Sequence, residues 1–179
     1  MTTFDTILES ARKWNEQALM KLYDICSKAA FNASYNIVSD RDDAEEITQD
    51  AIMTAFSLLG NFEGTEASFI AWVKKIAVNK SIDRYRRESR MPSRIDVEEF
   101  KEIEFVKYDD DELYSVEQIK KVIESLPEGY RIVITLRLLE DMEYEEIARV
   151  LGINESSVRS QYARGIARLK SEIGVGRTA

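Results

Sequence analysis

Apolar residues recur at intervals of three and four along most of the chain, the spacing that places them on one face of an α-helix. Between residues 4 and 35 this pattern predicts one short helix and one longer helix, separated near Asn15. A third helix is expected to end at about Leu59, and Asp42 or Asp43 can cap its start because carboxylates accept backbone N–H bonds. We therefore expect amphipathic helices that pack on a shared apolar core.

The next segment is expected to contain a loop followed by a long helix. Residues 60–67 contain two glycines and are predicted to form the loop, after which Ser68 can cap a helix that continues to about Ser89. The helical period returns at Ser115, and Pro127 marks the start of another helix, a position where its missing N–H is harmless. The apolar pattern thus predicts helices on both sides of an intervening segment.

That intervening segment, residues 91–114, lacks helical periodicity. A proline stands near its start and three consecutive aspartates near its end, a composition that is typical of a flexible linker. Glycine and proline are rare in the chain, with 7 and 2 residues among 179, and the dipeptides of tight β-hairpins are absent. We predict an all-α protein with two small helical domains, residues 1–90 and 115–179, joined by an acidic linker over residues 91–114.

Residues 143–170, EYEEIARVLGINESSVRSQYARGIARLK, carry the spacing of a helix-turn-helix. Ala148 falls where two helices would touch and only a small side chain fits, and Gly152 follows at the helix end, where a positive φ is needed. Asn154 can cap the second helix, and Val158 is expected to pack back into the core. The combination predicts a helix-turn-helix, a motif of many DNA-binding domains.

The second helix of this motif is predicted to have two distinct faces. At about 100° per residue, its apolar side chains gather on one side and would belong to the core. The opposite side is small, hydroxylic and basic, which suits the major groove, where arginines can reach guanine edges or phosphates. An ordinary amphipathic helix with solvated arginines is the alternative. The residues predicted to contact DNA are Ser156, Arg159, Ser160, Ala163 and Arg164.

Charge is distributed unevenly along a chain whose formal net charge is −8. Residues 36–70 carry 1 basic and 8 acidic groups, net −7, whereas residues 71–94 carry 8 basic and 2 acidic groups, net +6. Residues 149–179 carry 6 basic and 2 acidic groups, net +4. Basic segments attract phosphates, and Trp72 and Tyr85 in the first of them suit stacking on single-stranded DNA. A solvated basic helix with Trp72 in the core explains that segment at least as well.

Residue types exclude several classes of function. With no histidine and a single cysteine, Cys26, the chain offers neither a disulfide nor a zinc site, so no metal and no cofactor is expected. No glycine-rich phosphate loop appears, and Cys26 falls in an apolar helical pattern, so we expect no enzyme. No apolar run approaches the roughly 20 residues that span a bilayer, and Asp5 and Glu9 argue against a signal peptide. We expect a cytoplasmic protein without direct membrane insertion.

Three blocks of sequence occur in order, namely DAEEITQDAIMTAF (43–56), FIAWVKKIAVNKSIDRYRRESR (69–90) and SLPEGYRIVITLRLLEDMEYEEIARVLGINESSVRSQYARGIARLK (125–170). Together they resemble bacterial sigma factors of the extracytoplasmic-function group. The resemblance implies that the first domain binds the β′ clamp helices of core RNA polymerase and recognises and opens the promoter −10 element. It implies that the second domain binds the −35 element and contacts the β flap. It further implies an anti-sigma factor as a partner and a free protein that is monomeric.

Carried over by position, the resemblance assigns three sets of site residues. The polymerase set is Glu46, Gln49 and Asp50, with Ile47 facing the core between them. An ordinary exposed acidic helix start is the alternative for this set. The −10 set is Asn61, Phe62 and Glu63 in the loop and Lys75, Asn79, Lys80, Arg84, Arg86 and Arg87 in the following helix. The −35 set is the five residues already named on the second helix of the helix-turn-helix.

Two positions of that second helix depart from the family pattern. Gln161 stands where a basic residue is usual, and Gly165 and Ile166 stand where an Ala-Arg pair is usual. A glycine inside a helix costs about 1 kcal/mol relative to alanine, so Gly165 is expected to loosen the helix.

Two other classes of protein stay open from the sequence. A helix-turn-helix regulator with a helical dimerisation domain would bind duplex DNA tightly as a dimer, without polymerase. An adaptor protein that uses its acidic helix would leave the pattern over residues 143–170 unexplained. A sigma factor, in contrast, is expected to bind promoters weakly unless core polymerase is present.

Overall fold

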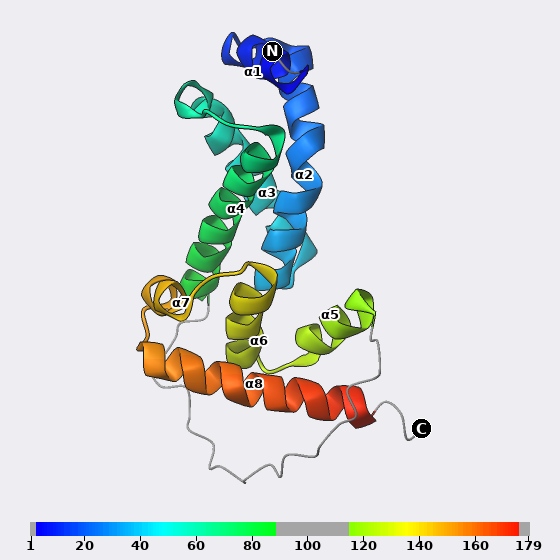
Figure 1. Ribbon diagram of the computed structural model, residues 1–179, viewed down its shortest axis with the longest axis vertical. Helices are drawn as coiled ribbons and strands as arrows, with labels where there is room; N and C mark the ends of the chain where they lie inside the picture. Colours follow the sequence, from blue (N-terminus) through cyan, green and yellow to red (C-terminus); the bar gives the residue numbers. More distant parts are fainter. Residues whose placement is uncertain (1–2, 89–114, 176–179) are drawn as a thin grey trace. The chain divides into compact units, whose positions relative to one another are not determined.

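The computed structural model of the chain describes residues 3–88 and 115–175, with side chains to residue 173. Within these ranges the regular structure is helical and contains no strand, which confirms the predicted all-α fold (Figure 1). The described residues fall into two compact units, residues 3–88 and 115–175. The predicted linker over residues 91–114 lies outside the described residues.

The first unit is a bundle in which α2, α3 and α4 pack against one another and α1 packs against α2 (Figure 1). Its core contains Leu22, Ile52, Phe69 and Val73, each almost completely buried. In each of these helices the buried residues recur at intervals of three and four, which is why the apolar periodicity predicted the bundle. The elements are α1 (Thr3–Arg12), α2 (Glu16–Val38), α3 (Arg41–Ser57), the 3₁₀ turn η1 (Leu59–Asn61) and α4 (Glu66–Glu88).

Side-chain caps set where two of these helices begin. Asn15 lies between α1 and α2, and its side-chain oxygen accepts the N–H of Ala18 at 3.0 Å, which confirms the predicted break. At the start of α3 the cap is Asp40, whose carboxylate accepts the N–H of Asp43 at 2.9 Å. The prediction that Asp42 or Asp43 caps this helix is therefore wrong. Both lie in the first turn, where the helix dipole favours negative charge.

The segment between α3 and α4 covers residues 58–65 and so lies two residues earlier than the predicted loop over residues 60–67. Residues 59–61 form the 3₁₀ turn, and α4 begins at Glu66, two residues before the predicted cap Ser68. The hydroxyl of Thr65 accepts the N–H of Ser68 at 3.3 Å, so Thr65 occupies the capping position. The Ser68 hydroxyl instead donates to the carbonyl of Thr65 at 2.9 Å.

The second unit is built on α8, which packs against α5, α6 and α7 (Figure 1). Ser115 starts the unit with a capping box: its hydroxyl accepts the N–H of Gln118, and the Gln118 side chain accepts the N–H of Ser115. Pro127 precedes the next helix directly, as predicted. The elements are α5 (Val116–Ser125), α6 (Glu128–Ile134), the π-helical turn η2 (Thr135–Leu139), α7 (Tyr144–Leu151) and α8 (Glu155–Val175).

Gly165 lies inside α8, against α6. A Cβ atom at this position would lie 2.6 Å from Ile134 Cδ1 and 3.2 Å from Tyr130 Cβ. Both distances are shorter than an ordinary van der Waals contact, so the missing side chain lets the two helices approach closely. Gly165 is a close-packing position within an uninterrupted α8, and the expected loosening of the helix stays a prediction.

None of the helices in the described ranges combines the length and the apolar character that crossing a membrane requires.

Candidate nucleic-acid interface

Residues 144–175 form a helix-turn-helix with the predicted turn. Gly152 follows α7 with a φ of 69°, and its N–H donates to the carbonyl of Ala148. Ile153 donates to the same carbonyl at 3.1 Å, so two bonds close the end of α7. Asn154 precedes α8, and its backbone carbonyl accepts the N–H of Val158 at 3.1 Å. Since only glycine adopts this φ without strain, Gly152 sets the angle at which α8 leaves the turn.

The α8 helix presents the two faces that the sequence predicted. Val158 and Leu169 are buried, whereas Tyr162 and Ile166 are half-buried against the core cluster that contains Leu169. Gln161, the departure from the family pattern, is also buried, so it contributes little to the outer face. On the opposite side, the −35 set divides by exposure: Arg164 is half-buried, and Ser156, Arg159, Ser160 and Ala163 are exposed.

Arg159 contacts two partners that sequence reasoning missed. Its Nε and Nη2 atoms donate to one carboxylate oxygen of Glu155, at 3.0 Å and 2.6 Å. Its guanidinium carbon lies 4.6 Å from the ring centroid of Tyr144, at the start of α7. Glu155 could have been found as an i,i+4 pair. Tyr144 could not, because its contact with α8 depends on how the turn folds.

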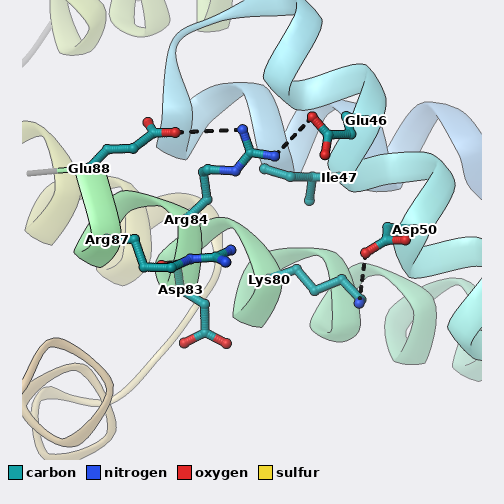
Figure 2. Close-up of a pocket in the computed structure, with 8 residues that line it drawn as sticks. All are labelled: Glu46, Ile47, Asp50, Lys80, Asp83, Arg84, Arg87 and Glu88. Atoms are coloured by element: carbon teal, nitrogen blue, oxygen red, sulfur yellow. Dashed lines mark hydrogen bonds and ion pairs between the residues drawn. The ribbon is translucent and has the colours of Figure 1, made fainter.

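The sides of α3 and α4 that face each other enclose a cavity of about 540 Å³ lined by both acidic and basic side chains (Figure 2). The cavity brings together members of the polymerase set from α3 and members of the −10 set from α4. Its lining residues are Glu46, Ile47, Asp50, Lys80, Asp83, Arg84, Arg87 and Glu88.

Arg84, one of the residues that line this cavity, is held by three carboxylates, two of which also line it. Its Nη1 lies 2.5 Å from Asp43. The same Nη1 lies 3.5 Å from Glu88, and Nη2 lies 2.9 Å from Glu46 (Figure 2). The hydrogen bond to Glu46 raises the pKa of Arg84, and the charges of Asp43, Glu46 and Glu88 act in the same direction while burial opposes them. With its side chain only 21% exposed, Arg84 joins α4 to α3 rather than facing outward. These carboxylates already pair with the guanidinium of Arg84, a residue that was assigned to DNA binding.

Lys80 forms a second link between the two helices. Its Nζ lies 3.2 Å from a carboxylate oxygen of Asp50, a member of the polymerase set (Figure 2). Ile47 is buried between the two acidic residues of α3, as expected, whereas Glu46, Gln49 and Asp50 are exposed. The polymerase set therefore includes two carboxylates that are also ion-pair partners of the −10 set.

The rest of the −10 set on α4 lies outward. Lys75, Asn79 and Arg86 are exposed and follow one another at intervals of four and seven residues, which places them along one stripe of the helix. Arg87 is exposed as well, and its Nε donates to the backbone carbonyl of Asp83 at 3.2 Å. This stripe, residues 75, 79 and 86 together with Arg87, is the outward basic surface of the first unit.

Within the loop, only two of the three assigned residues reach the surface. Asn61 and Glu63 are exposed, but Phe62 between them is 8% exposed. Its ring stacks on Trp72 at a centroid distance of 5.1 Å and meets the edge of Phe69 at 5.4 Å. Phe62 is thus a core residue in this structure, and its assignment to the −10 set stays a prediction. Trp72 is half-buried and packs against the core, which favours the alternative in which it is a core residue.

Arg12 fixes this loop from α1, and sequence reasoning missed it. Its Nε donates to the carbonyl of Leu59 at 3.1 Å, and its Nη2 donates to the carbonyl of Phe62. These bonds satisfy two backbone carbonyls, one in η1 and one directly after it, in the irregular residues before α4. A basic residue at the end of a helix carries no sequence signal for partners 47 and 50 positions away.

Comparison with known proteins finds matches to two regions of the same family. The family described as Sigma-70 region 2 matches residues 22–91, and the family described as Sigma-70, region 4 matches residues 116–169. The chain is 31% identical over 141 residues to the RNA polymerase sigma-H factor of Pseudomonas aeruginosa, covering 71% of each protein. It is 29% identical over 142 residues to the ECF RNA polymerase sigma-E factor of Escherichia coli, covering 73% of this chain and 74% of that protein.

A solved structure adds a likeness of fold. The sigma factor RpoE in complex with the anti-sigma factor NepR from Bartonella quintana aligns with a TM-score of 0.50 and 23% identity, over 90% of this chain and 98% of that chain. Given the sequence matches in both units, the chain belongs to the sigma-70 family of RNA polymerase sigma factors and, within it, to the extracytoplasmic-function group.

Proposed function

We propose that this protein binds core RNA polymerase and directs initiation at promoters with a −10 and a −35 element. The observation that carries the proposal is the helix-turn-helix within the region 4 match, whose second helix exposes Ser156, Arg159, Ser160 and Ala163. Small and hydroxylic side chains let a helix approach DNA closely, and arginine donates to guanine or phosphate. As a sigma factor, the protein is an initiation factor and not an enzyme.

The first unit is assigned to polymerase and to the −10 element. Glu46, Gln49 and Asp50 on α3 form the surface for the β′ clamp helices. The basic stripe of α4, together with Asn61 and Glu63 in the loop, holds the opened non-template strand. What supports this assignment is the outward direction of that stripe, because phosphate contacts and base stacking are how proteins hold single strands. Arg84 is left out of the contacts, since three carboxylates hold it.

The proposal includes further partners. The second unit contacts the β flap of polymerase, and an anti-sigma factor keeps the protein inactive. Support for such a partner comes from the Bartonella quintana sigma factor RpoE, which forms a complex with the anti-sigma factor NepR. The free protein is a monomer, because two different promoter elements meet two different units of one chain. The site of action is the cytoplasm, where polymerase and promoter DNA are found.

Run-off transcription with core RNA polymerase on genomic fragments tests the proposal. The full chain should direct discrete transcripts and identify its promoters. Glu46→Ala with Gln49→Ala should lose binding to core, whereas Glu45→Ala, an exposed neighbour outside the polymerase set, should keep it. Lys75→Ala with Arg86→Ala should bind core but open promoters poorly. Arg41→Ala, an exposed basic control on α3, should bind core and open promoters as the wild-type protein does.

One outcome would overturn this function. If the protein neither binds core polymerase nor directs initiation, but binds duplex DNA as a dimer, it is a helix-turn-helix regulator instead. Analytical ultracentrifugation of the same preparation would show which assembly is present.

A further inference from the structure

Arg159 is the exposed arginine of α8 whose guanidinium is held on two sides by residues from different helices. Glu155, one turn earlier on α8, accepts from Nε and Nη2 at 3.0 Å and 2.6 Å. Tyr144, the first residue of α7, places its ring 4.6 Å from the guanidinium carbon. A carboxylate in the guanidinium plane and a ring against its face together restrict both the position and the tilt of this group.

Tyr144 is itself fixed by further contacts. Its ring meets the ring of Tyr162 at 5.6 Å and an interplanar angle of 67°. The guanidinium of Arg137 lies 5.3 Å from the same ring centroid. Arg137 in turn donates to the carbonyl of Met142 at 3.2 Å and lies 3.5 Å from Glu143. The ring against Arg159 therefore belongs to a connected set of side chains and does not swing freely on the surface.

Glu155 binds one edge of the Arg159 guanidinium and leaves the edge formed by Nη1 and Nη2 open to another acceptor. A guanidinium has five N–H groups in one plane, and the Glu155 oxygen takes the Nε–H and one Nη2–H. Among the described residues, the hydrogen bonds of Arg159 use no other N–H, so both Nη1–H groups and the second Nη2–H are available to another acceptor. Two parallel N–H groups on an arginine match the O6 and N7 atoms of guanine in the major groove.

We propose that Tyr144 and Glu155 are positioning residues that set Arg159 to read one guanine of the −35 element. The inference rests on the proposed function, in which α8 enters the major groove. Holding the guanidinium in place before binding removes rotamers that would otherwise have to be frozen in the complex. The positioning residues therefore contribute to the choice of base at one position and leave the other positions of the element unaffected.

The test measures base preference position by position. The full chain, in complex with core polymerase, transcribes a library of promoters with a constant −10 element and a randomised −35 region, and the transcripts are sequenced. The wild-type protein should prefer guanine at one position by about 10- to 100-fold, the range for a bidentate arginine contact. Arg159→Ala should abolish that preference.

The variants of the positioning residues should act on the same base alone. Glu155→Ala and Tyr144→Leu should each weaken the guanine preference at that position about three- to tenfold and leave the preferences elsewhere unchanged. Tyr144→Phe keeps the ring and is the matched control, which should keep the preference. Thermal unfolding followed by circular dichroism checks that every variant is folded.

Three results would overturn the inference. Glu155→Ala and Tyr144→Leu with an undiminished guanine preference would show that Arg159 needs no positioning. A loss spread over all positions of the −35 element would show that these residues only support the helix-turn-helix. A wild-type protein that directs no initiation with core polymerase would remove the proposed function as well, and that outcome is distinct from the other two.

Discussion

The two basic surfaces of the protein are built differently. In the first unit, Arg84 and Lys80 on α4 pair with carboxylates of α3, which lie 30 or more positions earlier in the chain. In the second unit, Arg159 pairs with Glu155 on its own helix and stacks on Tyr144 of the preceding helix. In the first arrangement, arginine and lysine join two helices. In the second, an arginine stays exposed while its neighbours restrict the orientation of its guanidinium.

This comparison shows that basic residues close together in the sequence do not all contribute to one basic surface of the folded protein. Seven lysines and arginines fall within residues 72–90, but those that turn toward α3 are neutralised by the acidic residues they face. An ion pair with a mostly buried arginine contributes to folding, whereas an exposed i,i+4 pair contributes only about 0.3–0.5 kcal/mol. Side chains of the same type therefore have different roles according to which face of the helix they occupy.

The largest expected effect separates the two arginines by stability. Arg84→Ala leaves Asp43, Glu46 and Glu88 close together without their shared cation, so we expect the free energy of unfolding to fall by about 1–3 kcal/mol. Arg159→Ala removes an exposed ion pair and a cation–π contact and should lower it by about 1 kcal/mol or less. Urea unfolding of both variants measures the difference. Equal losses would mean that the links between α3 and α4 are no stronger than a surface pair.

A smaller effect is expected where α8 packs on α6. Gly165→Ala adds a methyl group that meets Ile134 and Tyr130, and overpacking of this kind costs about 1–3 kcal/mol. Alanine regains about 1 kcal/mol of helix propensity, so a net loss of about 1 kcal/mol is expected. The matched control is Gly60→Ala in the first unit, where an added Cβ meets no atom within 4 Å. Stabilisation by Gly165→Ala would contradict the close packing of these helices.

Removing one of the carboxylates should change DNA binding by the free protein. Asp50→Asn releases Lys80 from its ion pair and removes one negative charge next to the basic stripe. Binding of a single-stranded oligonucleotide, followed by fluorescence anisotropy at low salt, should become about two- to threefold tighter, with a steeper dependence on salt. Glu45→Gln, which removes an equal charge that pairs with Arg41, is the control. An unchanged affinity would show that this pairing does not withhold Lys80 from DNA.

The last prediction uses Cys26 as a probe that belongs to the first unit alone. Burial raises the pKa of its thiol to about 11, so at pH 8 only about one thiol in a thousand is ionised while the unit is folded. Because this pKa is higher in the folded state than in the unfolded state, raising the pH toward 11 lowers the stability of the first unit.

Alkylation of Cys26 at pH 8 should therefore follow opening of the first unit. Arg84→Ala should speed the reaction roughly tenfold for each 1.4 kcal/mol of lost stability, and Gly165→Ala should leave it unchanged. Faster labelling in both variants would indicate that the two units unfold together.

By itself, the sequence determined the features that depend on neighbours along the chain. Apolar periodicity predicted the helices, the Gly152 turn and the two faces of α8, because a helix repeats every 3.6 residues whatever it packs against. The caps were less well predicted: the break near Asn15 was right, but Asp40 and Thr65 replaced the residues expected to cap α3 and α4, since several polar side chains near a helix start can accept the same N–H groups.

Tertiary structure alone decided the features that depend on distant residues. Arg84 was assigned to DNA by position, and the packing of α4 on α3 brought it to Asp43, 41 positions away. Phe62 entered the core beside Trp72, and Gly165 became a contact with α6, because helix packing decides which side of each residue is covered. Charge and hydrophobicity are properties of a residue, but exposure and ion pairing are properties of its surroundings, which form only when the helices meet.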